Sequence, residues 1–552
     1  MRSIIIVLLI SLSLFTNNGF CAPTDSLITS QDVVHAEKLV GLEFTDTERD
    51  SLLDDVYDNL NSYRRMREIH LDNAIPPAIL FNPVPVGMSL PMGESRIAWS
   101  DYAGTKLPDD RDKLAFYSVG QLAELIRSRQ ITSEALTKFF LQRLKSYGPK
   151  LECVVTLTEE LALKQARHAD QEIAAGNYRG PLHGIPCGIK DLLATKGYKT
   201  TWGTMPYKDQ MIDDDATVVK KLHDAGAVLV AKLTMGALAW GDVWFGGMTR
   251  NPWDVTKGSS GSSAGPASAV SAGLVPFAIG TETWGSIVSP STVCGVTGLR
   301  PTYGRVSRTG AMALSWSMDK IGPICRTVED CAMVFNAIYG PDGIDQTLYD
   351  VPFHYYPDID LRTLKIGYLK SDFDSSYDFK TNDSLALNQM QVLGVTLIPI
   401  ELPDLPISDI SFILSTEAAA AFDELTRSNK DDQLVRQIKN AWPNVFRAHR
   451  FVPAVEYINA NRIRFLLIQQ MARLMESVDL CIAPSWQGDN LLLTNLTGHP
   501  CVVVPNGFSD DGMPTSFCFI GRLFDEGTIL AVAKKYQDAS GFHLRHPVIA
   551  VK

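Results

Sequence analysis

The chain has 552 residues, of which 45% are hydrophobic and 20% are charged, so it can bury a large core and is not intrinsically disordered. Its formal net charge is -11, and no cluster of lysines and arginines alternates with aromatic residues. The composition therefore excludes a typical nucleic-acid-binding protein.

The first 21 residues have the pattern of a cleaved secretory signal peptide. Arg2 is followed by an apolar run from Ile4 to Phe15 and then by small or polar residues. This run is shorter than the roughly 20 apolar residues that a membrane-spanning helix needs. We expect cleavage after Cys21 and export of a mature protein without stable membrane insertion; a retained anchor is the alternative.

Residues 22–112 are predicted to form a separate N-terminal region, partly helical and partly extended. The charged, periodic stretch from His35 to Glu68 predicts two helices, with Thr45 or Asp46 as a cap. The segment NAIPPAILFNPVPVGMSLPMG, residues 73–93, is rich in proline. We expect it to run extended over the surface of the main body.

Residues 113–552 are predicted to form one large catalytic domain. Two amphipathic helices are expected between residues 118 and 148, with a break near Gln130 and with Thr132 or Ser133 capping the second. Strand-like runs then alternate with helical segments; they are GIPCGIK, GAVLVAKL, LVPFAIGT, TLKIGYL, VDLCIAP and PCVVVP. This alternation predicts an α/β domain with a largely buried sheet.

The cysteines behave as small hydrophobic residues in this sequence. The eight that follow the predicted signal peptide form no CxxC pair, and most lie in apolar runs; they are Cys153, Cys187, Cys294, Cys325, Cys331, Cys481, Cys501 and Cys518. This pattern disfavours zinc and leaves one or two disulfides open. Asn382 and Asn495 match the glycosylation pattern, and Asn382 is the better candidate because its surroundings are polar and loop-like.

The segment GSSGSSAGPASAVSAGLVPFAIGTETWGSI, residues 258–287, has an unusual density of small residues. It lacks the GK[ST] of a phosphate-binding loop, and it continues into an apolar run, which a flexible linker does not. Residues 261–265, GSSAG, match the nucleophile elbow of esterases and would make Ser263 a nucleophile. That motif follows a buried strand, whereas TRNPWDVTKGSS is polar and contains a proline, so the esterase interpretation ranks second.

The run from Gly261 to Tyr303 resembles the signature segment of the amidase signature family of serine hydrolases. Residues 180–203, GPLHGIPCGIKDLLATKGYKTTWG, resemble the lysine segment of the same family, and similarity continues through SMDKIGPICRTVEDCA and the C-terminal run that starts with NLTGHPCVVVP. The resemblance covers about residues 115 to 533. It implies an α/β fold in which a large mixed sheet is covered by helices on both faces.

The resemblance assigns three catalytic residues, Lys190, Ser262 and Ser286. Ser262 is preferred over Ser259, since its spacing to Ser286 matches that of the family. Two positions depart from the usual pattern, Ala264 and Trp284, where glycine is common. Because of Trp284, the family pattern does not predict the shape of the pocket.

These residue types suit hydrolysis of an amide. Burial lowers the pKa of a lysine, so Lys190 at the end of an apolar run could act as a neutral base. Ser262 would pass the proton between Lys190 and Ser286, and the resemblance implies a cis peptide at Ser262. The backbone N–H groups of Thr283, Trp284 and Gly285 would stabilise the oxyanion, and attack by Ser286 would give an acyl-enzyme.

Other chemistries have less support in the sequence. His183 and His499 lie in turn-like settings, and the pair His543 and His546 is a weak metal pattern, so we expect no metal and no organic cofactor. Three functions stay open: a secreted amidase for a small-molecule or peptide-like carboxamide, the glutaminase-type subunit of a tRNA-dependent amidotransferase, and an inactive scaffold. The sequence predicts neither the particular amide nor the oligomeric state.

Overall fold

The computed structural model describes residues 28–549 of the chain. The chain divides into two compact units, Met1–Leu71 and Asp72–Lys552, so the proline-rich segment belongs to the second unit. The predicted signal peptide lies outside the described residues. Within residues 28–549, no helix combines the length and the apolar character that crossing a membrane requires.

The described part of the first unit is a pair of helices, α1 (Ser30–Val40) and α2 (Asp46–Met66). The side chain of Thr45 accepts a hydrogen bond from the first turn of α2, as an N-cap residue does. The guanidinium of Arg49 pairs with the carboxylate of Glu37 at 2.7 Å and ties the two helices together. Both the two helices and the Thr45 cap were predicted from the sequence.

The second unit is built around an eleven-stranded mixed sheet with the order β12-β11-β13-β15-β14-β8-β9-β7-β3-β4-β2. Parallel pairs at β12-β11-β13 and β7-β3-β4 flank a central antiparallel region. The strands are β2 (Val154–Leu157), β3 (Pro186–Lys190), β4 (Val228–Leu233), β7 (Phe277–Glu282), β8 (Thr297–Arg300), β9 (Lys320–Cys325), β11 (Ile366–Leu369), β12 (Leu397–Ile400), β13 (Leu480–Pro484), β14 (Cys501–Phe508) and β15 (Pro514–Gly521). Two small ladders join β1 (Arg96–Ile97) with β10 (His354–Tyr355) and β5 (Val243–Trp244) with β6 (Gly247–Met248).

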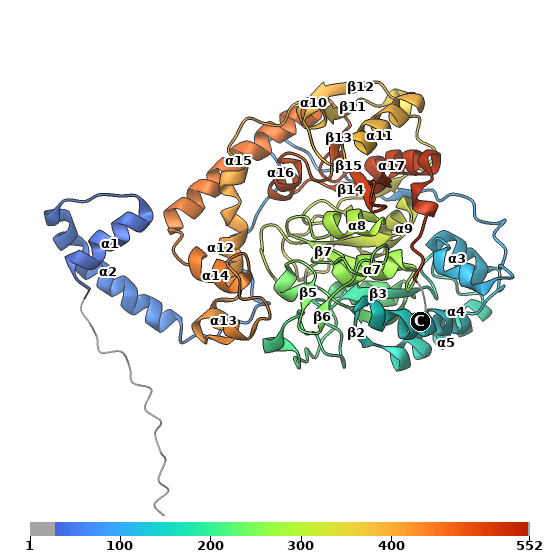
Figure 1. Ribbon diagram of the computed structural model, residues 1–552, viewed down its shortest axis with the longest axis horizontal. Coiled ribbons are helices and arrows are strands. Elements are labelled where there is room, and N and C mark those ends of the chain that lie inside the picture. The colour runs from blue at the N-terminus through green and yellow to red at the C-terminus, as the bar shows by residue number, and fades with distance from the viewer. Residues whose placement is uncertain (1–27, 550–552) are drawn as a thin grey trace, which may run out of the picture. The chain divides into compact units, whose positions relative to one another are not determined.

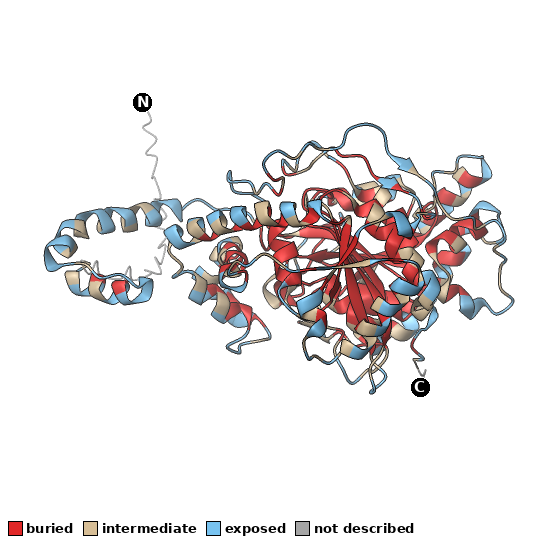
Figure 2. Cartoon of the chain, turned by 90° about the horizontal axis from the view of Figure 1, so that it is seen from above, coloured by how far each residue is buried: buried red, intermediate tan, exposed pale blue. Residues whose placement is uncertain are grey.

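Both faces of the central strands are buried, as Figure 2 shows by the red interior of the second unit. In β7, Phe277 and Ile279 belong to one hydrophobic cluster, whereas Ala278 belongs to another. Successive side chains of a strand point to opposite faces, so these two clusters are the cores on the two sides of the sheet. This explains why the predicted strands are continuous apolar runs rather than alternating ones.

Helices cover both faces of the sheet, which confirms the predicted fold class (Figure 1). Their bounds are α3 (Val119–Arg127), α4 (Ser133–Leu151), α5 (Glu159–Ala174), α6 (Thr217–Asp224), α7 (Ala264–Ser271), α8 (Val288–Cys294), α9 (Val328–Ile338), α10 (Lys370–Asp374), α11 (Lys380–Val392), α12 (Phe412–Ala421), α13 (Asp423–Arg427), α14 (Trp442–His449), α15 (Ala454–Glu476), α16 (Asn490–Thr497) and α17 (Glu526–Ser540). The predicted helix pair corresponds to α3 and α4, and Thr132 is the N-cap of α4.

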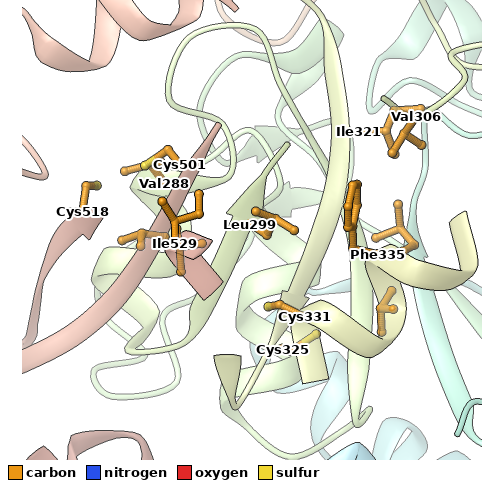
Figure 3. Close-up of a cluster of buried hydrophobic side chains, with 14 of the residues drawn as sticks. Val288, Leu299, Val306, Ile321, Cys325, Cys331, Phe335, Cys501, Cys518 and Ile529 are labelled. Carbon is orange, nitrogen blue, oxygen red and sulfur yellow. The ribbon is translucent and has the colours of Figure 1, made fainter. Parts of the chain in front are cut away.

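The eight cysteines of the described residues are buried and unpaired, as expected for small hydrophobic side chains. Figure 3 shows Cys325, Cys331, Cys501 and Cys518 among the aliphatic and aromatic residues of one buried cluster. Cys187 belongs to the same cluster, and burial raises the pKa of its thiol well above the ordinary value. The thiol therefore stays protonated.

The loop-like setting predicted for Asn382 is wrong. Asn382 lies in the first turn of α11, and its side-chain amide donates to the carbonyl of Phe508 and to the Thr515 hydroxyl. The polar residues around it belong to a helix that packs on β14 and β15. Asn495, in α16, is 1% exposed and donates to the carboxylate of Glu282.

Candidate active site

Lys190 is the last residue of β3 and is completely buried. Its ammonium nitrogen lies 2.9 Å from the Ser262 hydroxyl, 3.1 Å from the Ser263 hydroxyl and 2.8 Å from the Thr281 hydroxyl. None of these partners is a carboxylate. The lysine is therefore held by neutral groups, and no ion pair fixes it in its charged form.

This setting determines the protonation of Lys190. Burial lowers its pKa to about 7, and the more distant negative charges of Asp319 and Glu282 oppose that shift. Removing a lysine from water disfavours the ammonium form, since the neutral amine loses far less hydration. At neutral pH a large fraction of Lys190 is thus a neutral amine with a lone pair.

The two serines beside Lys190 differ in the use of their hydroxyl groups. The Ser263 hydroxyl donates to the carbonyl of Thr281 at 3.0 Å and accepts from the N–H of Thr281 and from Lys190, both at 3.1 Å. A hydroxyl has one donor and two acceptor positions, so Ser263 has none left. The Ser262 hydroxyl accepts from Lys190 and keeps its proton available for transfer.

Ser263 can lie close to the sheet because the residue of β7 that faces it is a glycine. A Cβ atom on Gly280 in β7 would lie 2.8 Å from the Ser263 oxygen. Ser263 precedes α7, whose residues are all buried, and the Gly261–Ser262 peptide bond is cis, as the resemblance implied. No strand directly precedes the GSSAG motif, which removes the strand that the esterase interpretation requires.

Ser286 lies on the loop between β7 and α8, next to the same serines. Its carbonyl accepts a hydrogen bond of 3.2 Å from the N–H of Ser263, and the residue is 9% exposed, so it borders the solvent-accessible part of the site. No hydrogen bond joins the Ser262 and Ser286 hydroxyls among the described residues. The predicted trio thus consists of one direct contact, Lys190 to Ser262, and a neighbouring serine.

The loop from Thr283 to Ser286 presents unused backbone donors. Within residues 28–549, the N–H groups of Thr283, Trp284, Gly285 and Ser286 donate to no protein acceptor. Gly285 has φ of 88°, a left-handed conformation that other residues rarely adopt. Unpaired N–H groups on a bent loop are the arrangement that stabilises a developing oxyanion.

A buried carboxylate holds this loop in place. One oxygen of Glu282 accepts from the N–H groups of Ile287 and Val288 at 2.8 and 3.0 Å. The other accepts from Arg300 at 2.7 Å and from Asn495 at 2.9 Å. Burial raises the pKa of Glu282, but the Arg300 charge and these hydrogen bonds outweigh it and hold the pKa at about 2.

A second carboxylate, Asp319, fixes the start of the loop. It accepts from the Thr283 hydroxyl at 2.5 Å and from the N–H groups of Leu314 and Ser315 at 2.8 and 3.0 Å. Three residues of this site were not predicted from the sequence: Thr281, Glu282 and Asp319. Their signal was present in the quoted segments SMDKIG and GTETWGSI, but nothing in the sequence indicates that these side chains meet.

A cavity of about 410 Å³ opens beside this site. Thr281, Thr283 and Asp319 are among its lining residues, and Thr281 is the residue that contacts Lys190. Ala239 also lines it. Trp284 is 48% exposed and does not line this cavity.

The histidines lie away from the serines. His183 contacts Glu172 at 3.1 Å, and His499 contacts the Thr497 hydroxyl at 2.7 Å. His546 stacks on the ring of Phe116 at 3.7 Å. Among residues 28–549, no group of three or more His, Cys, Asp or Glu side chains is arranged to hold a metal ion.

Comparison with known proteins places this site in a family. The family model described as Amidase matches residues 135–530. The A subunit of glutamyl-tRNA(Gln) amidotransferase from Carboxydothermus hydrogenoformans is 33% identical over 488 residues, which cover 79% of this chain and 99% of that protein. Its counterpart from Geobacillus kaustophilus is 34% identical over 481 residues, which cover 78% of this chain and 99% of that protein.

Solved structures agree with the sequence match. The native peptide amidase from Stenotrophomonas maltophilia has a TM-score of 0.69 and 28% identity, and covers 78% of this chain and 98% of its own. A crystal structure of a peptide amidase in complex with the competitive inhibitor chymostatin has a TM-score of 0.70 and 28% identity, with 78% and 99% covered. The chain therefore belongs to the amidase signature family, whose members are enzymes that hydrolyse amide C–N bonds.

Proposed function

We propose that the protein hydrolyses a carboxamide through a relay of Lys190, Ser262 and Ser286, with an acyl-enzyme formed on Ser286. The observation that carries the proposal is the 2.9 Å contact between a lysine without a carboxylate partner and a serine hydroxyl that retains its proton. A neutral amine can accept that proton, whereas an ammonium group cannot.

In the proposed first step, two proton transfers along the relay accompany the formation of one bond. Lys190 takes the proton of the Ser262 hydroxyl, and Ser262 takes the proton of Ser286, whose oxygen attacks the carbonyl carbon. The negative charge that develops on the carbonyl oxygen would be stabilised by N–H groups of the loop from Thr283 to Ser286. Each such donor is worth about 3 kcal/mol in comparable enzymes.

The second half of the reaction reverses the proton path. The C–N bond breaks, and the nitrogen leaves as ammonia or an amine with the proton that the relay returns. A water molecule then loses its proton to the relay, attacks the ester on Ser286 and releases the carboxylic acid. The full use of the Ser263 hydroxyl argues against this serine as nucleophile and favours a supporting role near Lys190.

A second candidate is the glutaminase-type subunit of an amidotransferase. The names of the curated relatives favour it over a free-standing amidase, because both relatives described above belong to amidotransferases and are covered over 99% of their length. Such a protein would release ammonia from glutamine and would need partner subunits. The same relay would serve either function, so the two candidates differ in substrate and in partners.

Export is a separate proposal, based on the predicted signal peptide of residues 1–21. An exported enzyme would favour a free-standing amidase. N-terminal sequencing of protein secreted by the source cells should begin near Ala22; an intact Met1 would contradict export.

The experiment that tests the function uses the purified full-length chain without partners. We would measure ammonia release from glutamine, from C-terminal peptide amides and from apolar carboxamides, and map a fluorophosphonate adduct by mass spectrometry. Hydrolysis of apolar or peptide amides with an adduct on Ser286 supports the amidase. Activity on glutamine alone supports the amidotransferase function, and an adduct on another residue refutes the relay.

A further inference from the structure

A proline-rich strap, defined here as residues 73–81, forms one wall of the cavity beside the active site. Asn73 and seven further residues of the strap line this cavity; the seven are Ala74, Pro76, Pro77, Ala78, Ile79, Leu80 and Phe81. The strap precedes the family match, which begins at residue 135. This part of the cavity is therefore supplied by the chain's own N-terminal extension.

The strap is anchored at both ends. At one end, the side-chain amide of Asn73 donates to the carbonyl of Ala313 at 2.9 Å and accepts from the N–H of the same residue at 2.8 Å. At the other end, the Phe81 ring lies 3.6 Å from the guanidinium of Arg464 and packs edge-on against Tyr303. The strap is thus a fixed part of the second unit.

Between the anchors, residues 74–80 are all exposed. The backbone of residues 76–81 forms no hydrogen bond within the described chain, and Pro76 and Pro77 have no N–H to donate. Ile79 and Leu80 are 86% and 43% exposed although they line the cavity. Apolar side chains left partly exposed at the edge of a cavity are typical of a ligand-binding surface.

The main body of the second unit also contributes apolar side chains to the cavity. Leu192, Met312, Leu314, Trp316 and Ile321 line it, together with Thr281, Thr283 and other polar residues. Lys190, Ser262 and Ser286 do not themselves line the cavity, and Thr281, which contacts Lys190, links it to the proposed relay. The volume of about 410 Å³ is within the range of small-molecule sites.

The charged residues of the cavity already have partners within the chain. Arg308 pairs with Asp345 at 3.4 Å and donates to the Thr347 hydroxyl, and Asp319 is bound to Thr283. Lys320 donates to the carbonyl of Met318, and burial lowers its pKa well below the ordinary value. The charged groups of the cavity are thus all engaged by other groups of the chain.

We infer that the cavity-lining residues of the strap, together with the apolar residues that line the cavity with them, form the acyl-binding site, and that this site selects amides with an elongated apolar acyl group over glutamine. The inference rests on the proposed amide hydrolysis and names its substrate class. Burial of each additional methylene would favour binding by up to about fourfold.

The test compares p-nitroanilides of acetic, hexanoic and decanoic acid with the full-length enzyme. We expect kcat/KM to rise with acyl length, and Leu80→Asp and Ile79→Asp to lower the decanoyl-to-acetyl ratio of kcat/KM by about tenfold or more, because a carboxylate in an apolar site is costly. Ile75→Asp is the matched control: Ile75 is a strap residue that is 51% exposed and does not line the cavity, so the ratio should not change.

A second measurement does not depend on turnover. In an Ala78→Cys/Ser286→Ala chain, decanamide should slow maleimide modification of the new cysteine, whereas acetamide and glutamine should not. Equal hydrolysis of all acyl lengths, or an equal effect of both Asp variants on every substrate, would overturn the strap inference and leave the amidase intact. If the wild type hydrolyses no amide, the proposed function fails; protection of the cysteine by decanamide then still supports the binding site, and its absence overturns it.

Discussion

The pH dependence of catalysis is the sharpest consequence of the buried lysine. An exposed lysine, with a pKa near 10.4, is neutral in only about 1 molecule in 2,500 at pH 7. With a pKa of about 7, Lys190 is neutral in about half of the molecules at pH 7. Burial thus raises the concentration of the active base about a thousandfold at neutral pH.

The lowered pKa of Lys190 determines how kcat/KM is expected to depend on pH. The neutral fraction of Lys190 is about one tenth at pH 6 and about nine tenths at pH 8, so kcat/KM should rise about tenfold over this interval and then level off. The sign follows from the role of the base, since activity requires the deprotonated form, which gains population as the pH rises. A fully charged Lys190→Arg variant should lose activity by about three orders of magnitude or more at every pH.

The assay measures kcat/KM for one amide from pH 5 to 10, because the pH dependence of kcat/KM reports the pKa values of the free enzyme. Circular dichroism over the same range controls for unfolding. A profile that keeps rising tenfold per pH unit through pH 9 would mean an unperturbed lysine. A maximum near pH 5 with loss of activity above pH 7 would mean carboxylate chemistry. The first result would refute the lowered pKa of Lys190, and the second would refute its role as the base.

The remaining predictions concern the nucleophile and the two carboxylates. Ser286→Ala should abolish turnover and fluorophosphonate labelling, whereas Ser263→Ala should keep the labelling, as intact-mass spectrometry will show; the reverse pattern would support the esterase interpretation. Glu282→Gln leaves its buried arginine without a counter-charge and should lower the free energy of unfolding by about 3–5 kcal/mol in urea titrations. The exposed Glu159→Gln should cost less than about 1 kcal/mol; equal losses would contradict the role of burial. Asp319→Asn removes a negative charge that raises the pKa of Lys190, so the rising limb of the pH profile should move to lower pH; a shift to higher pH would contradict it.

Local sequence patterns determined much of the architecture. Thr45 and Thr132 precede their helices in patterns that satisfy free backbone N–H groups, and both are N-caps in the structure. The apolar run that contains β7 forms a strand with both faces buried, as its composition indicates. These features depend on neighbours within a few residues, and for that reason they could be predicted from the sequence alone. Lys190 and Ser262 were predicted from motifs of the family, and the structure brings them into contact.

Only the tertiary structure decided which groups surround these residues. Glu282 meets Arg300 and Asn495 because β7, β8 and α16 converge, and no local pattern encodes a meeting of segments so distant in sequence. The polar stretch around Asn382 looks like a loop, but contacts with β14 and β15 make it a helix. The proline-rich strap was expected on the surface; its position over the cavity follows from anchors more than 200 residues away in sequence, Ala313 and Arg464. The sequence by itself thus determined the local elements and the chemical type of the site, whereas long-range packing decided its charge balance and the wall of its pocket, because burial and electrostatics depend on all the segments that meet there.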